Sequence, residues 1–201
     1  MSYALEGSIF VAGALIKWLR DELGLLRTVE ESEEFALSVP DTAGVYVVPA
    51  FTGLGAPWWN PDARGIVTGL TFGARKEHIV RAALESLAYQ SADLISAFEN
   101  DSGISIKSLK VDGGVATNGF LMQFMSDILG TPIIRPDNPE ATSLGAAFLA
   151  GLFCGFWRDQ EELLALDLPA QSFLPGQINN QIDSQLLMAG WHRALARCVF
   201  H

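Results

Sequence analysis

The chain has 201 residues, of which 49% are hydrophobic and 18% are charged. This composition excludes a disordered chain and predicts a single folded domain over residues 1–201. Acidic residues outnumber basic ones by 23 to 13, giving a formal net charge of −10, which argues against nucleic acid and anionic lipid as partners.

The first half of the chain predicts two strands, a helix and a long loop. Residues 3–10 are typical of a strand, whose edge is either natural or left by a preceding segment that this sequence lacks. Apolar positions at helical spacing predict a helix over 11–23, and residues 28–38 indicate an acidic, solvated helix face or loop. The apolar run 45–50 predicts a strand buried on both faces, as in parallel or mixed sheets. The Gly-, Pro- and Trp-rich segment 51–75 predicts either a functional loop or one packed by its own aromatic residues.

The second half alternates helices with short strands. The predicted elements are a long helix over 78–98, a strand over 104–111, a helix over 118–129, a strand over 132–135, a helix over 142–153 and a final helix over 181–199. Thr142 or Ser143 is expected to cap the helix over 142–153, whose small residues favour close approach to a sheet or another helix. Cys154 lies in the same apolar run and is expected to be buried. This order predicts an α/β domain with a mainly parallel or mixed sheet.

A double glycine between the strand over 104–111 and the next helix is the main candidate site. Gly113 and Gly114 lack Cβ atoms, so a phosphate or flat ligand can approach the main chain closely. The following helix N-terminus is expected to offer unpaired N–H groups and partial positive charge. Asn118 either caps that helix or donates to a ligand, and Asp112 is a candidate acceptor for a ligand hydroxyl or a magnesium-bound water. On this motif alone, a plain turn is the favoured interpretation.

Other residues carry weaker signals. No Walker A sequence occurs, and no complete Gly-x-Gly-x-x-Gly follows a strand. His78, His192 and His201 lack metal-ligand spacing, so they are expected at the surface and no metal site is predicted. Glu85, in the long helix, is expected to be a partly buried structural carboxylate rather than a catalytic one. Two cysteines favour a reducing, cytoplasmic location, and no apolar run reaches the roughly 18 residues of a membrane span.

Two segments together resemble a known signature. Residues 65–70 (Gly-x-Val-x-Gly-Leu) and 78–85 (His-Ile-x-x-Ala-Ala-Leu-Glu) are similar to the C-terminal signature of the FGGY carbohydrate kinase family. Six further segments also resemble this family: residues 3–7, 47–57, 111–114, 120–124, 127–130 and 144–147. In these segments the chain is more similar to the glycerol kinases than to the sugar kinases of the family. It covers nearly all of residues 3–195.

The resemblance implies the C-terminal domain of the actin/hexokinase-like (ribonuclease H-like) ATPase fold, with a mixed sheet flanked by helices. It implies a homo-oligomeric parent enzyme that transfers the γ-phosphoryl group of ATP to glycerol, with ATP or ADP and Mg²⁺ in a cleft between two domains. In the family pattern Gly13, Gly114 and Asn118 contact the nucleotide, and the turn chemistry adds Gly113. Lys17 replaces a frequent glutamine of glycerol kinases and is left out of this predicted site.

The resemblance also assigns several functions to a part that this sequence lacks. The glycerol contacts, the aspartate base and a Thr/Gly-rich hairpin that touches ATP phosphates are expected there. We therefore expect no catalytic residue in this chain and negligible turnover by it alone. The alternative is a stand-alone nucleotide-binding or oligomerisation module without catalysis.

Overall fold

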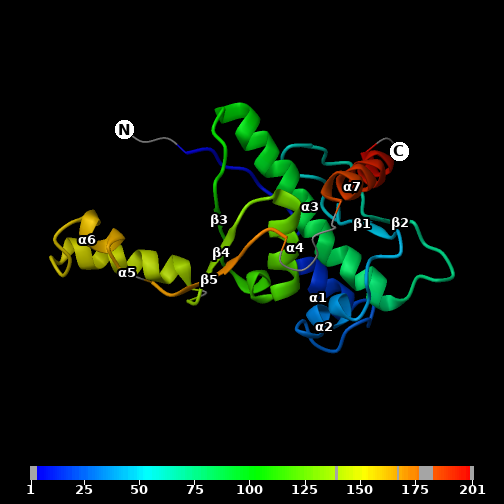
Figure 1. Cartoon of the computed structure of the whole chain (residues 1–201), viewed down its shortest axis with the longest axis horizontal. Coiled ribbons are helices and arrows are strands. Elements are labelled where there is room, and N and C mark those ends of the chain that lie inside the picture. The colour runs from blue at the N-terminus through cyan, green and yellow to red at the C-terminus, as the bar shows by residue number, and fades with distance from the viewer. Residues whose placement is uncertain (1–3, 139, 167, 177–182, 200–201) are drawn as a thin grey trace.

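The computed structural model describes residues 4–138, 140–166, 168–176 and 183–199. Its elements, in chain order, are α1 (Gly13–Asp21), α2 (Glu31–Leu37), β1 (Tyr46–Val48), β2 (Ile66–Thr68), α3 (Lys76–Ser102), β3 (Leu109–Lys110), the 3-10 helix η1 (Gly114–Thr117), α4 (Gly119–Leu129), β4 (Ile133–Pro136), α5 (Ala141–Phe153), α6 (Gln160–Leu164), β5 (Ala170–Phe173) and α7 (Ser184–Val199). A body built around α3 carries, on one side, an arm made of α5 and α6 (Figure 1).

Helix α3 is the centre of the body, because α1, α2, α4, α7 and β1 all pack against it. The predicted helix over 78–98 is confirmed and extends further at both ends. At its start the Arg75 N–H donates to Nδ1 of His78 over 2.9 Å, and at its end Gly103 adopts φ 68°. The expectation that His78 lies at the surface is wrong, because its ring is buried while it caps the helix. His201 lies outside the described residues.

A three-stranded sheet in the order β3-β4-β5 lies beside α4. Strands β3 and β4 are parallel, whereas β4 and β5 are antiparallel, so the predicted mixed sheet with flanking helices is confirmed. The predicted strand over 104–111 is largely wrong, because only Leu109–Lys110 form a strand. The strand expected over 132–135 and the helix over 118–129 are confirmed within a residue.

Strands β1 and β2 form a separate antiparallel pair. Val47 and Val48 are buried, as predicted, but β1 pairs with the following strand rather than joining a parallel or mixed sheet. Helix α7 packs over this pair, and the Tyr46 hydroxyl donates to the Leu187 carbonyl over 3.3 Å. This helix confirms the prediction over 181–199 in its described part.

The N-terminal segment differs from its prediction. Residues 4–10 of the expected strand over 3–10 contain no strand; residues 1–3 lie outside the described part. The segment is held by side-chain packing, because a Cβ at Gly7 would collide with Leu94 of α3. It is also held by the Ser8 carbonyl, which accepts from the Ala56 N–H over 3.0 Å.

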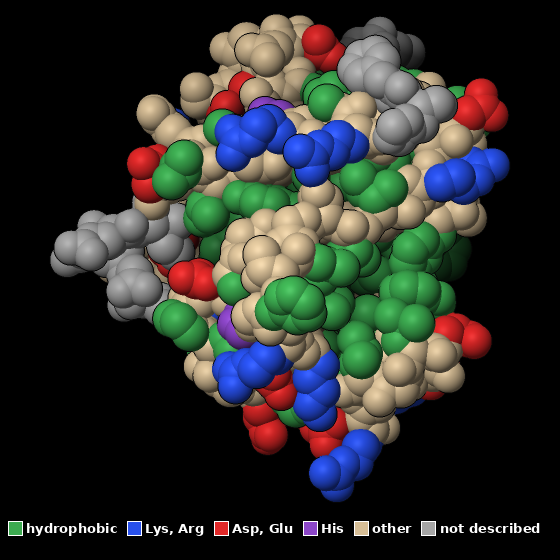
Figure 2. All heavy atoms as spheres, turned by 90° about the vertical axis from the view of Figure 1, so that its right-hand side faces the viewer, with side chains coloured by type: hydrophobic (Ala, Val, Ile, Leu, Met, Phe, Trp, Pro, Cys, Tyr) green, Lys and Arg blue, Asp and Glu red, His purple; other side chains and the backbone are tan. Residues whose placement is uncertain are grey.

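Helix α5 also departs from expectation. Its small residues do not bring it against the body, because none of its side chains is buried. Glu140 is its N-cap, without a side-chain hydrogen bond, so neither Thr142 nor Ser143 caps it. Cys154, expected to be buried, is exposed. The opposite end of the molecule shows hydrophobic side chains gathered between two groups of Lys and Arg side chains (Figure 2).

Candidate functional site

The Gly113–Gly114 turn lies where two parallel strands end. Strand β3 leads into Asp112 and Gly113, while Arg135 lies near the end of β4, which leads into Asp137. Carboxyl ends of parallel neighbours meet at one edge of a sheet, which is the usual place for ligands in α/β folds. The two segments accordingly line a common hollow of about 240 Å³, called here the Arg135 hollow.

A second hollow of about 220 Å³ lies on the other side of the turn, and it is called here the α2 hollow. Its apolar lining residues are Ile16, Val29, Leu84 and Val115, and its other lining residues are Glu30, Ser32, Glu33, Gly114, Thr117 and Asn118. These residues come from α1, α2, α3, η1 and the segments joining them. The α2 hollow therefore combines an apolar wall with a polar rim, as small-molecule sites do.

The main chain at the turn is open. Gly113 adopts φ 87°, a left-handed conformation that favours glycine. A Cβ added at Gly113 or Gly114 would meet no heavy atom within 4 Å, so no neighbouring side chain fills the bend. The first turn of a helix leaves N–H groups without intrahelical acceptors, and in η1 these belong to Gly114 and Val115. The turn can therefore receive a ligand against its backbone.

The structure brings the four predicted binding residues together. Gly13 begins α1, and a Cβ there would lie 3.7 Å from Cγ2 of Val115. Val115 lies within η1, which connects Gly114 to Asn118. Lys17 lies exposed on α1 and is absent from the residues that line the α2 hollow.

Asn118 both caps α4 and joins it to α2. Its Oδ1 accepts from the Leu121 N–H over 2.9 Å, and its Nδ2 donates to Oγ of Ser32 over 3.2 Å. The Phe120 N–H donates to the Glu33 carboxylate over 3.2 Å. The sequence prediction of free N–H groups at this helix is therefore wrong for Phe120 and Leu121, and the open N–H groups are those of η1.

Sequence reasoning missed α2 and Arg135. The acidic pattern of 28–38 indicates a solvated helix face or loop, yet Ser32 is buried, and both Ser32 and Glu33 bond to the start of α4. Arg135 donates from Nη1 to the carbonyls of Ala116 and Thr117 over 2.7 and 3.0 Å, which anchors η1 to β4. The parallel strand order would have placed Arg135 beside the turn, since Arg135 lies near the carboxyl end of one strand and the turn follows its parallel neighbour.

An ion pair on α3 lies inside the body, and its Arg81 also donates to the Ala36 carbonyl of α2. Arg81 Nε donates to Glu85 Oε1 over 2.8 Å, with the two side chains 13% and 4% exposed. The Tyr89 hydroxyl donates to the other carboxylate oxygen over 2.9 Å. Burial raises the pKa of Glu85, while Arg81 and Tyr89 oppose that shift. Burial and the nearby Glu85 carboxylate also raise the pKa of Tyr89. Glu85 is hydrogen-bonded as expected, but it is buried more deeply than the partly buried carboxylate that the sequence predicts.

His192 and the Gly-, Pro- and Trp-rich segment 51–75 both contact neighbouring helices. His192 Nε2 lies 2.7 Å from Asp93 Oδ1, and the Trp191 indole donates to Asp93 Oδ2 over 2.8 Å, joining α7 to α3. In the Gly-rich loop, the Phe51 ring packs against Trp18 with centroids 4.8 Å apart. Within the described ranges, no three His, Cys, Asp or Glu side chains gather as a metal site. In the same ranges, no helix has the length and apolar character to cross a bilayer.

Comparisons with known proteins agree on one family. The model of the FGGY family of carbohydrate kinases, C-terminal domain, matches residues 1–154. The chain is 53% identical over 199 residues to a glycerol kinase of Clostridium botulinum, covering 99% of this chain and 40% of the relative. It is 55% identical over 197 residues to a glycerol kinase of Carboxydothermus hydrogenoformans, covering 98% and 39%. The chain thus spans about two fifths of these curated relatives.

Solved structures give the same result for the fold. The crystal structure of Plasmodium falciparum glycerol kinase with ADP matches with a TM-score of 0.85 and 34% identity, covering 96% of this chain and 38% of that one. The ligand-bound xylulose kinase of Lactobacillus acidophilus matches with a TM-score of 0.77 at 23% identity, covering 96% and 40%. The expected actin/hexokinase-like fold is therefore confirmed.

Proposed function

Because the chain belongs to the FGGY family of carbohydrate kinases, we propose that it forms the C-terminal, ATP-binding part of a glycerol kinase. The proposed reaction converts ATP and glycerol into ADP and glycerol 3-phosphate. The chain spans only about two fifths of its curated relatives, so the activity is proposed for a protein that also contains the remaining part. Residues 1–201 are proposed to act as one nucleotide-binding domain.

The open main chain at Gly113–Gly114 is the observation that supports this proposal best. No heavy atom would obstruct a Cβ at either glycine, and the α2 hollow begins beside them. We propose that the adenine ring enters the α2 hollow beside Val115, over a floor formed by the buried side chains of Ile16 and Leu84. The phosphates then lie along the N–H groups that begin η1, which favours anions. The ADP in the structure of the Plasmodium falciparum glycerol kinase supports a nucleotide as the ligand.

Each proposed binding residue has a distinct role. Gly13 and Gly114 keep Cβ atoms away from the space where the nucleotide lies, and Gly113 gives the turn its left-handed conformation. Asn118 holds α4 and α2 together at the rim. Arg135 keeps η1 attached to β4. Phosphoryl transfer depends mainly on positioning and charge stabilisation, so these residues contribute by orienting the donor.

The remaining functional assignments follow from the proposed activity. Mg²⁺ would accompany the nucleotide and neutralise charge on its phosphates; we assign its ligands mainly to the part that this chain lacks. A homo-oligomeric parent enzyme is proposed with it. ATP as the phosphoryl donor and two free thiols, Cys154 and Cys198, support a cytoplasmic location.

Calorimetric titration with ADP tests the nucleotide site. We expect the chain to bind ADP and Gly114→Val to weaken binding at least tenfold, because the new side chain enters the space left open for the ligand. Gly73→Ala is the matched control, since Gly73 lies in an exposed loop where a Cβ meets only the Thr71 hydroxyl, at 3.6 Å. Equal heats from the chain and Gly114→Val would remove the turn from the site.

A coupled ADP-release assay with saturating glycerol tests whether this chain can catalyse phosphoryl transfer without the remaining part of the protein. We expect the chain alone to turn over far more slowly than the ~1 s⁻¹ at the lower end of kinase rates. A rate above that value would show that the chain carries its own base and glycerol site. ADP binding with no turnover, even after the remaining part is supplied, would favour the stand-alone nucleotide-binding module.

A further inference from the structure

Another hollow lies where α7 packs over β1 and β2 (Figure 1), and it is called here the α7 hollow. Its volume is about 140 Å³, which is below the ~300–1,000 Å³ of sites that enclose drug-sized ligands. It shares no lining residue with the α2 hollow or the Arg135 hollow. Its size suits a small ion or one end group of a larger molecule. Its lining residues are Gly44, Tyr46, Thr68, Gly69, Gly190, Arg193, Ala194 and Arg197.

Helix α7 contributes two arginines to this hollow from one face. Arg193 and Arg197 are one helical turn apart, so they lie on the same side of α7. Gly190 lies on that side one turn earlier, and a Cβ there would collide with the Tyr46 side chain, so α7 lies close against β1. The Tyr46 hydroxyl donates to the Leu187 carbonyl over 3.3 Å. These contacts fix which face of α7 lies toward the hollow.

The two guanidinium groups are held near hydroxyl groups. Arg197 Nη1 donates to Thr68 Oγ1 over 2.6 Å, and the Thr68 hydroxyl retains its own hydrogen to donate to a ligand. Burial and the Glu85 carboxylate raise the pKa of Tyr46, while the charge of Arg193 opposes them, which is consistent with Arg193 lying near that hydroxyl. Among the described residues, neither guanidinium forms an ion pair with a carboxylate.

The opposite wall of the hollow is main chain. Gly44 precedes β1 and Gly69 follows β2, with φ of 79° and 81°, a conformation that favours glycine. A Cβ at Gly69 would collide with the Gly44 carbonyl, so the two segments touch. Because neither glycine has a side chain, a small ligand can approach this wall closely.

The donors of the α7 hollow match a phosphate group. A guanidinium is planar, always charged, and presents paired N–H groups that fit phosphate oxygens. The described lining contains two such groups and no Asp or Glu. The chain as a whole has a formal charge of −10, so two arginines without carboxylate partners form a local positive site on an acidic protein.

We propose that the α7 hollow binds the phosphate group of a small soluble molecule, either inorganic phosphate or a phosphate monoester. Arg193 and Arg197 hold the phosphate oxygens from α7, and the Thr68 hydroxyl donates from β2. Extended polyanions such as nucleic acid or an anionic membrane fit less well, because the net charge of the chain repels them. The site is separate from the proposed nucleotide site and does not require it.

Nuclear magnetic resonance of the ¹⁵N-labelled chain, titrated with inorganic phosphate at constant ionic strength, tests this proposal. We expect saturable shifts in the amide signals of Gly44 and Gly69 and in the Nε–H signals of Arg193 and Arg197. A second titration uses glycerol 3-phosphate as a monoester. Tighter binding of the monoester would identify an organic phosphate as the ligand, and equal or weaker binding would identify the free ion. A third titration uses acetate, which should not reproduce the shifts.

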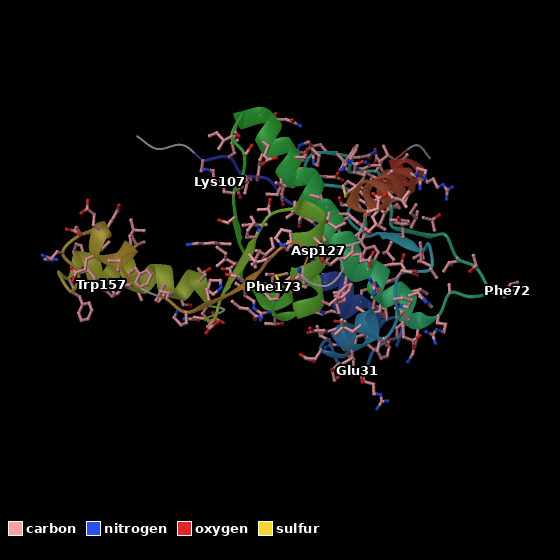
Figure 3. The ribbon with its side chains drawn as sticks, viewed as in Figure 1. Glu31, Phe72, Lys107, Asp127, Trp157 and Phe173 are labelled. Carbon is pink, nitrogen blue, oxygen red and sulfur yellow. The ribbon has the colours of Figure 1, made fainter. Side chains whose placement is uncertain are left out.

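Variants make the test specific. Arg193→Gln and Arg197→Gln should each weaken phosphate binding about fivefold or more, since bonds to charged groups are strong although this site is open to solvent. Arg197→Lys keeps the charge but loses the paired donors, so its loss should be smaller. Lys107→Gln is the charge-matched control and should bind phosphate unchanged, because Lys107 is exposed beside β3, away from α7 (Figure 3).

A cross-check separates this hollow from the nucleotide site. Gly114→Val should bind phosphate at the α7 hollow as the unaltered chain does, and Arg193→Gln should leave ADP binding in calorimetry unchanged. Circular dichroism shows that each variant is folded. The proposal is overturned by the absence of saturable shifts, by shifts that acetate reproduces, by phosphate binding that survives both glutamine substitutions, or by loss of these shifts in Gly114→Val.

Discussion

Truncating one partner of the Arg81–Glu85 pair is expected to destabilise the fold strongly. Glu85→Met leaves the Arg81 guanidinium largely buried, still donating to the carbonyls of Ala36 and Val39 over 3.1 and 2.6 Å but without its counter-charge. Removing one member of a buried ion pair costs about 3–5 kcal/mol. The Tyr89 hydroxyl also loses its acceptor, which adds about 1 kcal/mol or more. We expect a total loss of roughly 4 kcal/mol or more in the free energy of unfolding.

Urea unfolding followed by far-ultraviolet circular dichroism measures this loss. A double-mutant cycle of Arg81→Met, Glu85→Met and the combined variant isolates the pair. The combined variant should be more stable than the sum of the single losses implies, because it leaves no buried charge without a partner. Single losses below about 1 kcal/mol, or losses that simply add, would refute the reasoning.

The same carboxylate predicts how stability changes with pH. Burial raises the pKa of Glu85 in the folded chain above its ordinary value, which is about 4.3 in an unfolded chain. The folded state therefore holds this proton more tightly, and the resulting stabilisation is complete below the unfolded pKa. It is lost as pH rises through the folded pKa. Glu85→Gln has no titrating carboxyl at this position and should not lose this stabilisation as pH rises. The unfolding free energy of wild type, relative to that of Glu85→Gln, should therefore decrease as pH rises through the folded pKa. A constant difference would contradict the shift.

Three further predictions concern glycine, cysteine and asparagine. Gly69→Ala should destabilise the chain more than Gly103→Ala, by about 1 kcal/mol or more in urea unfolding. Both residues have positive φ, but only at Gly69 would a Cβ collide with the backbone, at the Gly44 carbonyl; equal losses would contradict this. In thiol titration at pH 8, Cys154 should react rapidly and Cys198 slowly, because Cys154 is exposed, whereas burial raises the pKa of the Cys198 thiol; Cys154→Ser should remove the fast phase. Asn118→Ala should lower the unfolding free energy by about 1 kcal/mol, because α4 loses its N-cap, and it should also weaken ADP binding in calorimetry. A loss of stability with unchanged ADP binding would show that Asn118 caps the helix but does not contribute to the proposed site.

The elements with strong local patterns were predictable from the sequence. Helix α3 carries a long apolar stripe and ends at Gly103, so its position follows from periodicity and a glycine cap. The Gly113–Gly114 turn could be located because two glycines between a predicted strand and a predicted helix indicate a tight turn. Its openness, however, depends on the side chains around it, which local patterns do not specify.

Contacts between distant segments were not predictable in the same way. The acidic residues of α2 looked solvated, yet Glu33 bonds to the Phe120 N–H, 87 positions away. The strand expected over 104–111 is short because only Leu109–Lys110 pair with β4, and a sequence pattern does not say whether a partner strand is present. Helix α5 has the small residues of a closely packed helix, but packing also requires a surface to receive it.

The hairpin-like pairing of β4 and β5 fixes the two ends of the arm side by side. Pro136 pairs with Ala170, and the Asp137 N–H donates to the Pro169 carbonyl over 3.0 Å, so the chain leaves and re-enters the sheet at adjacent points. Insertions whose ends meet in this way can be shortened or exchanged without moving the framework around them. An engineered chain with a tight turn in place of 138–168 would therefore keep the register of β4 with β5 and leave the glycine turn in place, which would give a smaller body on which to measure nucleotide binding.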